Sequence, residues 1–358
     1  MKAFTFDQLP SRIVFAAGAV SQVGAEVERL GASRVMLVHD AMTKSSADSV
    51  DDQLGARLAL RWDEVAQHVP VELAERARAA ATEHVIDAVV SIGGGSSTGL
   101  AKALALSHRV PIVVVPTTYA GSEQTTIFGL TGGQHKQTGK DPVVLPRVVV
   151  YDPELTLGLP RSVTGPSAFN ALAHSVEALW APGNNPITSA LALEGVRAIH
   201  RSLPVVMAHP NDVDARGDLL YGAALSGMAL GATAAGLHHK LCHVLGGRFN
   251  LVHADAHSVV LPHALAFNAP ALPDEMARLA EALGVPGDDP AGALWDLAVA
   301  SDVPTRLADL HGSEGPLHRD QLAGAADAAA AEITVNPRPV TGDDLLAILQ
   351  RAYDGHRP

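Results

Sequence analysis

The strongest constraint on the fold of this chain is a change in the spacing of its apolar residues near residue 160. Before that point, short runs rich in Val and Ile alternate with stretches of helical periodicity. The strand-like runs are 34–39, 86–92, 111–115 and 147–151, and the helical stretches are 19–30, 71–83 and 97–107. Apolar strands that alternate with helices predict a parallel sheet that is covered on both faces.

After residue 160 the strand-like runs nearly vanish, and Ala- and Leu-rich helical patterns replace them. These helical stretches are 166–180, 187–201, 213–235, 236–246, 274–284, 290–300, 319–332 and 342–353. The sequence therefore predicts a Rossmann-like α/β domain at 1–158 and an all-helical domain at 159–358.

Composition excludes several classes of function. The chain has 358 residues, of which 47% are hydrophobic, so it can bury a core in each of two domains. A formal net charge of −12 does not attract nucleic acid or an anionic membrane surface. A single cysteine, Cys242, excludes an intrachain disulfide. No signal-like N-terminus and no apolar stretch of about 18 residues is present, so we expect a cytoplasmic protein without a membrane span.

A glycine-rich loop follows the predicted strand at 86–92. Residues 91–103 read SIGGGSSTGLAKA, which places glycines between a buried strand and a helix. Gly94, Gly95 and Ser96 can approach a pyrophosphate closely, and the N–H groups of the helix N-terminus can bind it. A hydroxyl side chain of the first turn can cap that helix. The loop matches neither GxGxxG nor a Walker loop, and a turn without a ligand is the alternative.

Two further strand ends carry polar groups. Residues 116–123, PTTYAGSE, follow a buried strand, and Thr117, Thr118 and Ser122 can donate to phosphate or ribose. Asp40 ends the run 34–39, where a carboxylate can accept from a ribose 2′-OH and repel a 2′-phosphate. Together these features favour a dinucleotide, with NADH over NADPH. The alternatives are a capped turn for the first group and a helix cap for Asp40.

Histidines are concentrated late in the chain, with six of the 17 between residues 238 and 263. The i,i+4 spacing of Asn170 and His174 and of His239 and His243 places each pair on one helix face. With His253, these residues can bring three imidazoles and one side-chain oxygen to a single point. Such a set is typical of a transition-metal site, but a neutral Asn in place of a carboxylate argues against a tightly held cation.

The segments GGGSSTGLAKA, PTTYAGSE, NALAH and GLHHKLCHVLGG occur in an order that resembles the iron-containing alcohol dehydrogenase superfamily, and within it the maleylacetate reductases. The resemblance covers essentially the whole chain. It implies a dehydroquinate synthase-like fold, with the active site in the cleft between the two domains, and a homodimer.

The resemblance also implies which residues would bind a metal. In the metal-dependent branch, an Asp at position 170 acts with histidines at 174, 239 and 253 to hold iron or zinc. This chain departs at Asn170, at Gly99 (usually Asp), and at Tyr119 of PTTYAGSE, where that branch reads PTTAGTGSE. All three departures resemble the reductase branch, whose members are thought to work without a metal, so we expect none.

The implied reaction is the NADH- or NADPH-dependent reduction of the carbon–carbon double bond of maleylacetate, an enone dicarboxylate, to 3-oxoadipate in the breakdown of aromatic compounds. Hydride addition leaves an enolate, which needs an oxyanion donor and a proton. The implied catalytic residues are His243 (beside the nicotinamide), His174, His239, His253 and Tyr119. Asn170, His238 and Lys240 are expected near the substrate, and Lys136 near the cofactor ribose.

Three alternatives stay open at this point. The first is a metal-dependent alcohol or aldehyde dehydrogenase that uses Asn170 as a ligand. The second is an enzyme similar to glycerol dehydrogenase or dehydroquinate synthase, which PTTYAGSE does not favour. The third is a non-catalytic dinucleotide sensor, which would leave the histidines without a role.

Overall fold

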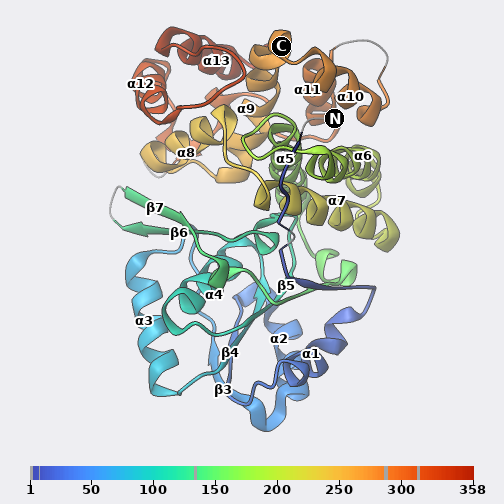
Figure 1. Ribbon diagram of the computed structural model, residues 1–358, viewed down its shortest axis with the longest axis vertical. Helices are drawn as coiled ribbons and strands as arrows, with labels where there is room; N and C mark the ends of the chain where they lie inside the picture. Colours follow the sequence, from blue (N-terminus) through green and yellow to red (C-terminus); the bar gives the residue numbers. More distant parts are fainter. Residues whose placement is uncertain (1–2, 8, 133–134, 286–288, 313–314) are drawn as a thin grey trace. The chain divides into compact units, whose positions relative to one another are not determined.

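The computed structural model describes residues 3–7, 9–132, 135–285, 289–312 and 315–358 (Figure 1). The chain divides into two compact units. Here the sheet unit denotes Asp7–Leu159 with Asn211–Leu220, and the helical unit denotes Met1–Phe6, Pro160–Pro210 and Tyr221–Pro358. No helix of the described residues is long and apolar enough to cross a membrane.

The sheet unit is built on a six-stranded parallel sheet with the strand order β1-β8-β5-β4-β2-β3. The strands are β1 (Arg12–Phe15), β2 (Val35–Val38), β3 (Leu58–Trp62), β4 (Ala88–Gly93), β5 (Ile112–Pro116) and β8 (Val148–Tyr151). The four central strands are the apolar runs expected from the sequence, and all of their residues are buried. The two edge strands were not expected, because their apolar runs are only three residues long and neither strand is fully buried.

Helices cover both faces of this sheet, as the alternation of strands and helices predicts (Figure 1). Met36 and Val38 pack into a core with α3 (Val71–Glu83) and α4 (Gly95–His108). Val35 and Leu37 face the opposite core, with α1 (Val23–Arg29) and α2 (Lys44–Leu54). An antiparallel hairpin, β6 (Ile127–Gly132) and β7 (His135–Lys140), follows the second loop and was not expected.

The helical unit confirms the second half of the fold prediction. Its helices are α5 (Arg161–Ala178), α6 (Pro186–Ala208), α8 (Leu237–Phe249), α9 (His253–Asn268), α10 (Pro273–Leu283), α11 (Pro290–Ala300), α12 (Leu322–Glu332) and α13 (Gly342–Asp354). Helix α7 (Val213–Gly231) contributes residues to both units. A two-residue pairing joins β9 (His311–Gly312) to β10 (Gly315–Pro316).

The periodicity of the sequence did not predict helix α9. It contains Pro262 and three histidines, and it is buried on nearly all sides over its second half. A helix that is apolar all round has no stripe to detect. Because α9 packs against α5, α8, α11 and α13, it buries His257 in the interior of the helical unit, whereas His253, in its first turn, is partly exposed.

Candidate functional site

The glycine-rich loop forms an open anion-binding turn in the sheet unit. Strand β4 ends at Gly93, and α4 begins at Gly95 with its first intrahelical bond from Thr98 N to Gly94 O, 3.1 Å. No side chain of the described residues caps this helix, so the expected hydroxyl cap is wrong. The first backbone N–H groups of α4 are therefore available to a ligand. The buried Oγ of Ser97 also has no hydrogen-bond partner among the described residues. The turn fits a pyrophosphate.

The second loop lies directly against the first. Thr117 N donates to Gly93 O over 3.0 Å, and a Cβ at Gly94 would lie 3.0 Å from Thr118 Cγ2. The Oγ of Ser122 is buried without a hydrogen-bond partner among the described residues. The expected phosphate and ribose donors are thus gathered at the carboxyl ends of β4 and β5, where open α/β sheets bind nucleotides.

Lys102, on the helix that follows the first loop, donates hydrogen bonds to the segment around the second loop. The sequence did not predict this contact. The Lys102 side chain projects from α4 and is almost completely buried. The Nζ atom donates to the carbonyl oxygens of Ser122, Thr125 and Ile127 at 2.7, 2.8 and 2.7 Å. The position of a lysine on the buried face of a predicted helix was the available signal, since lysines are rarely buried without partners.

Asp40 serves as a helix cap and also lies beside the phosphate loop. Its Oδ1 accepts from Met42 N and Thr43 N at 2.9 and 3.0 Å, so it caps a short 3-10 helix, Ala41–Thr43. Its Oδ2 would lie 3.3 Å from a Cβ at Gly93. The cap therefore leaves one carboxylate oxygen facing the loop, in a position suited to a ribose hydroxyl.

Tyr119 is enclosed within the sheet unit. The side chain is fully buried, and Arg216 Nη1 donates to its hydroxyl over 3.1 Å. Burial raises the pKa of the Tyr119 phenol. The hydroxyl therefore keeps its proton at neutral pH, and its role as an acid or donor toward substrate stays a prediction.

The two expected lysines are placed differently. Lys136 belongs to β7, but its side chain lies outside the part of the chain that the structure describes. Lys240 Nζ forms an ion pair with Glu332 Oε2 of α12 over 3.3 Å, and both side chains are partly exposed. Contact of either lysine with a ligand stays a prediction.

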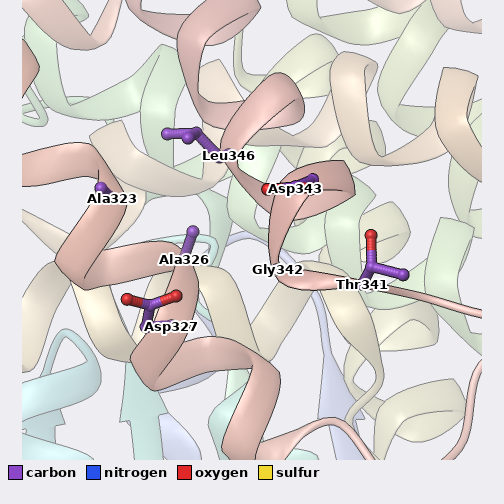
Figure 2. A pocket seen from close by; sticks show the side chains of 7 residues that line it. All are labelled: Ala323, Ala326, Asp327, Thr341, Gly342, Asp343 and Leu346. Carbon is purple, nitrogen blue, oxygen red and sulfur yellow. The ribbon is translucent and has the colours of Figure 1, made fainter.

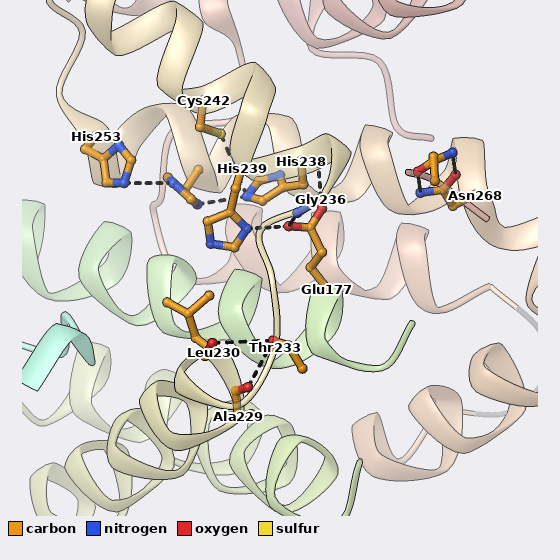
Figure 3. Close-up of polar contacts among 12 residues, drawn as sticks. Glu177, Ala229, Leu230, Thr233, Gly236, His238, His239, Cys242, His253 and Asn268 are labelled. Atoms are coloured by element: carbon orange, nitrogen blue, oxygen red, sulfur yellow. Dashed lines mark hydrogen bonds and ion pairs between the residues drawn. The ribbon is translucent and has the colours of Figure 1, made fainter. Parts of the chain in front are cut away.

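Six histidines form one cluster in the helical unit, called here the histidine cluster: His174, His238, His239, His243, His253 and His257. Figure 3 shows part of this cluster, with His238, His239 and His253 labelled. They come from α5, α8 and α9. The rings of His174 and His239 are stacked with centroids 5.3 Å apart, and those of His243 and His253 are stacked at 5.9 Å. The structure thus brings together all the histidines proposed from the sequence, and Asn170 is buried one turn before His174.

His257 was missed as a site residue and links the cluster internally. His238 Nε2 and His257 Nδ1 are 2.8 Å apart, and His257 Nε2 and His253 Nε2 are 3.0 Å apart. Burial lowers the pKa of His257 well below its usual range, and it lowers that of His238 to about 3. These rings are therefore neutral at physiological pH. The i,i+4 spacing from His253 was the available signal.

Glu177 is the second missed residue. It lies on α5, one turn after His174, and its side chain is 2% exposed. Its Oε2 accepts from His239 Nδ1 at 2.5 Å and from Gly236 N at 2.8 Å, and its Oε1 accepts from His238 N at 2.8 Å (Figure 3). Burial alone would raise the pKa of Glu177, but the contacts with His239, His238 and Gly236 together outweigh burial and lower this pKa to about 2. The carboxylate is ionised at neutral pH.

Two neighbouring features do not belong to this site. His263 is buried further along α9, where burial lowers its pKa to about 4 and Arg351 and His356 are its charged neighbours. A pocket of about 320 Å³ lies on α12 and α13 (Figure 2). It is lined by Ala323, Ala326, Asp327, Thr341, Gly342, Asp343 and Leu346. Its two carboxylates repel an anionic substrate.

The structure does not gather the ligand histidines of the metal-dependent branch as one close group. Among the described residues, the His, Cys, Asp and Glu side chains whose ligand atoms all lie within 4.8 Å of one another are His238, Cys242 and His257. His174, His239 and His253 do not form such a group, and Asn170 offers no negative charge. In the group that is close, the two histidines already face each other in a hydrogen bond, and burial raises the pKa of Cys242 far above its usual range.

An uncapped glycine-rich helix N-terminus on a parallel sheet fits a dinucleotide, and a cluster of imidazoles in the helical unit can supply donors and protons, as a dinucleotide-dependent oxidoreductase requires. Comparison with family models agrees, since residues 10–153 match the iron-containing alcohol dehydrogenase model and 164–353 match the C-terminal model of that family. The chain belongs to the iron-containing alcohol dehydrogenase family.

Individual relatives are similar over their full length. The maleylacetate reductase of Burkholderia cepacia is 47% identical over 358 residues, which is 100% of each chain. That of Sphingobium indicum is 46% identical over 99% of each chain. The crystal structure of maleylacetate reductase from Agrobacterium tumefaciens matches with a TM-score of 0.94 and 43% identity over 100% of both chains.

Proposed function

We propose that this protein catalyses the NADH- or NADPH-dependent reduction of the carbon–carbon double bond of maleylacetate to 3-oxoadipate, without a bound metal ion. The full-length similarity to proteins named maleylacetate reductases supports the substrate. The observation that carries the chemistry is a buried imidazole cluster with Asn170 where a metal site needs a carboxylate.

The reduction of an enone can proceed in a site lined by imidazoles. Hydride adds to the alkene carbon remote from the ketone, and the electron pair of the double bond moves to give an enolate. The alkene carbon next to the ketone then takes a proton. Because conjugation spreads the negative charge onto the ketone oxygen, hydrogen-bond donors can stabilise it. His243 is proposed beside the nicotinamide, and the other rings are proposed to face the substrate.

The charge of the substrate also favours imidazoles. Maleylacetate carries two carboxylates, whereas this chain has a net charge of −12. A site for such a dianion needs local positive charge and N–H donors. The histidine cluster supplies donors in a buried setting, where hydrogen bonds to a charged group are strong.

The sheet unit is proposed to hold the dinucleotide. The free N–H groups of α4 would bind the pyrophosphate, with Thr117, Thr118 and Ser122 as further donors. The reaction requires the nicotinamide to reach the histidine cluster. The expected cleft between the two domains and the expected homodimer stay predictions.

The test of the proposal is NADH oxidation by the purified protein with maleylacetate, before and after extensive dialysis against a strong chelator. We expect turnover that depends on maleylacetate and that is unchanged by the chelator within about twofold. Loss of activity that Fe²⁺ or Zn²⁺ restores would establish the metal-dependent alternative. Turnover of simple alcohols without turnover of maleylacetate would overturn the substrate assignment.

Cofactor preference is expected to depend on Asp40. In Asp40→Ser, the hydroxyl still caps the helix Ala41–Thr43, but the negative charge beside the loop is lost. We expect kcat/KM with NADPH, relative to NADH, to rise by about tenfold, which corresponds to ~1.4 kcal/mol. The measurement is steady-state kinetics with both cofactors.

Asp141→Ser is the matched control for this substitution. Asp141 also caps a short 3-10 helix of the sheet unit, through Val143 N at 2.8 Å. Its replacement should leave the cofactor ratio unchanged. An equal ratio in Asp40→Ser and wild type would show that Asp40 does not face the ribose.

A further inference from the structure

Oxygen atoms from the segment that continues the second loop converge on the ammonium group of Lys102. Its Nζ atom lies 2.7 Å from Ser122 O, 2.8 Å from Thr125 O, 3.0 Å from Thr125 Oγ1 and 2.7 Å from Ile127 O. An ammonium group has three protons, so these four acceptors use all of its hydrogen bonds. Because the side chain is also almost completely buried, Lys102 has no N–H left for a cofactor.

The charge of Lys102 allows these oxygen atoms to lie close together. Three backbone carbonyl groups point their negative ends at one site, which is unfavourable unless a cation occupies it. A buried ammonium is in turn costly unless oxygen atoms replace its water. Burial lowers the pKa of Lys102 to about 7, and the charge of Glu123 opposes that change. The conformation of segment 122–127 and the positive charge of Lys102 therefore stabilise each other.

Ser122 connects this ammonium group to the proposed cofactor site. Its carbonyl oxygen accepts from Lys102 Nζ, and also from Thr125 N at 3.1 Å and Thr125 Oγ1 at 3.0 Å. The Oγ atom of Ser122 is buried and has no hydrogen-bond partner among the described residues, as expected of a donor that binds a ligand. The hydrogen bonds to its carbonyl group fix the backbone of Ser122, so Lys102 restricts where this hydroxyl can lie.

Lys102 also connects Ser122 to the glycine-rich loop. It belongs to α4, whose first N–H groups, after Gly94, are proposed to bind the pyrophosphate. Lys102 lies about two turns further along that helix. One helix therefore carries the N–H donors at its start and, through the ammonium group, holds Ser122 of the second loop.

We propose that Lys102 is a positioning residue for the dinucleotide, and that its ammonium group holds Ser122 where the Ser122 hydroxyl and the N–H groups of α4 donate to the same cofactor phosphates. This inference rests on the proposed function for the dinucleotide itself. Lys102 does not touch the cofactor in this account. The hydroxyl of Ser122 is the donor through which it acts.

Two substitutions separate the charge of Lys102 from the space that it fills. Lys102→Met keeps most of the side-chain length but removes the charge and all three donors. We expect the dissociation constant and the KM for NADH to rise by about tenfold, the usual effect of losing one hydrogen bond to a charged group. The kcat at saturating NADH should stay within about threefold of wild type, because the histidine cluster belongs to the helical unit.

Lys102→Ala leaves space for a small amine at the same oxygen atoms. Propylammonium matches the three carbon atoms and the nitrogen that this substitution removes, so it should restore NADH binding to the variant. Propanol is similar in size but uncharged, and it should not restore binding. The measurement is the titration of NADH, followed by its fluorescence, in each solution at the same ionic strength.

Arg57→Met is the matched control. Arg57 is another basic residue of the sheet unit, but it forms an exposed ion pair with Glu28 over 3.5 Å. Its replacement should leave NADH binding unchanged. A Lys102→Met protein that is folded, as judged by its thermal melt, and that binds NADH as tightly as wild type would overturn the proposal. Equal NADH binding by Lys102→Ala in propylammonium and in propanol would also overturn it, because charge would then not be the determinant.

A spectroscopic test on the wild-type protein needs no active enzyme. The chain has few lysines, so protein labelled with 15N-lysine gives few signals, and that of Lys102 is assigned by its loss in Lys102→Arg. At pH 6, below the pKa of about 7, we expect an ammonium signal whose protons exchange slowly with water, because they are buried in hydrogen bonds. A neutral amine or fast exchange would overturn the proposal. A slowly exchanging ammonium in a protein that does not bind NADH would support the contact with segment 122–127 and contradict the proposed function instead.

Discussion

His239→Ala is expected to lower kcat with maleylacetate by about 10²-fold or more and to destabilise the protein as well. The turnover is expected to fall because a ring that we propose to face the substrate is lost. The stability falls because Glu177 then remains as a buried carboxylate without its partner at 2.5 Å. Leaving a buried charged acceptor without its donor costs more than the about 1–3 kcal/mol that a neutral buried group costs.

The measurement is steady-state turnover together with urea unfolding of the same samples. His243→Ala provides an informative comparison, because His243 is partly exposed and is proposed beside the nicotinamide. It should lower turnover by a similar factor with a smaller loss of stability. His209→Ala is the control, since His209 is exposed at the end of α6. Near wild-type turnover in both His239→Ala and His243→Ala would remove the basis for a catalytic histidine cluster.

Gly93→Ala is expected to weaken NADH binding by about 10²-fold, while the histidine cluster in the other unit is unaffected. Gly93 has φ +148°, a conformation that L-residues rarely adopt. A Cβ at this position would also lie 2.3 Å from Ser97 Oγ and 2.9 Å from Ser97 Cβ. The loop must shift to relieve the unfavourable φ angle and the close contacts with Ser97. The N–H groups at the start of α4 shift with it.

Binding is measured by titrating the protein with NADH and following the fluorescence of the bound cofactor. Gly158→Ala is the matched control in the same unit, because a Cβ there meets nothing within 4 Å. It should bind NADH as the wild type does. An equal dissociation constant for Gly93→Ala would mean that the phosphates lie elsewhere on the sheet unit.

The fold was predictable to the extent that burial leaves a pattern in the sequence. Central strands such as β4 are buried on both faces, so they read as continuous apolar runs. The edge strand β3 is half-exposed throughout and has no such run. Helix α2 reads as polar, since Ala47, Val50 and Leu54 are its buried residues. Periodicity therefore identifies the central strands of the sheet and misses its edges.

The histidines of the site were predictable from the sequence, but the contacts that link them to other side chains were not. Spacing along single helices found His174, His239 and His243. Glu177 and His239 are 62 residues apart, and only the packing of α5 near α8 brings them together. No periodicity in the sequence indicates that these two side chains are in contact. Lys102 was missed for the same reason, since its acceptors lie 20 to 25 residues further along the chain.

The central claim is that hydride goes to the carbon–carbon double bond and not to the ketone. The direct measurement uses NADH deuterated at the transferable position, maleylacetate in ordinary water, and NMR of the product. The account predicts 3-oxoadipate with an intact ketone and one deuterium on the former alkene carbon remote from it. A product with deuterium on a carbinol carbon and an intact double bond would contradict the account and make this chain an alcohol dehydrogenase in chemistry as well as in family.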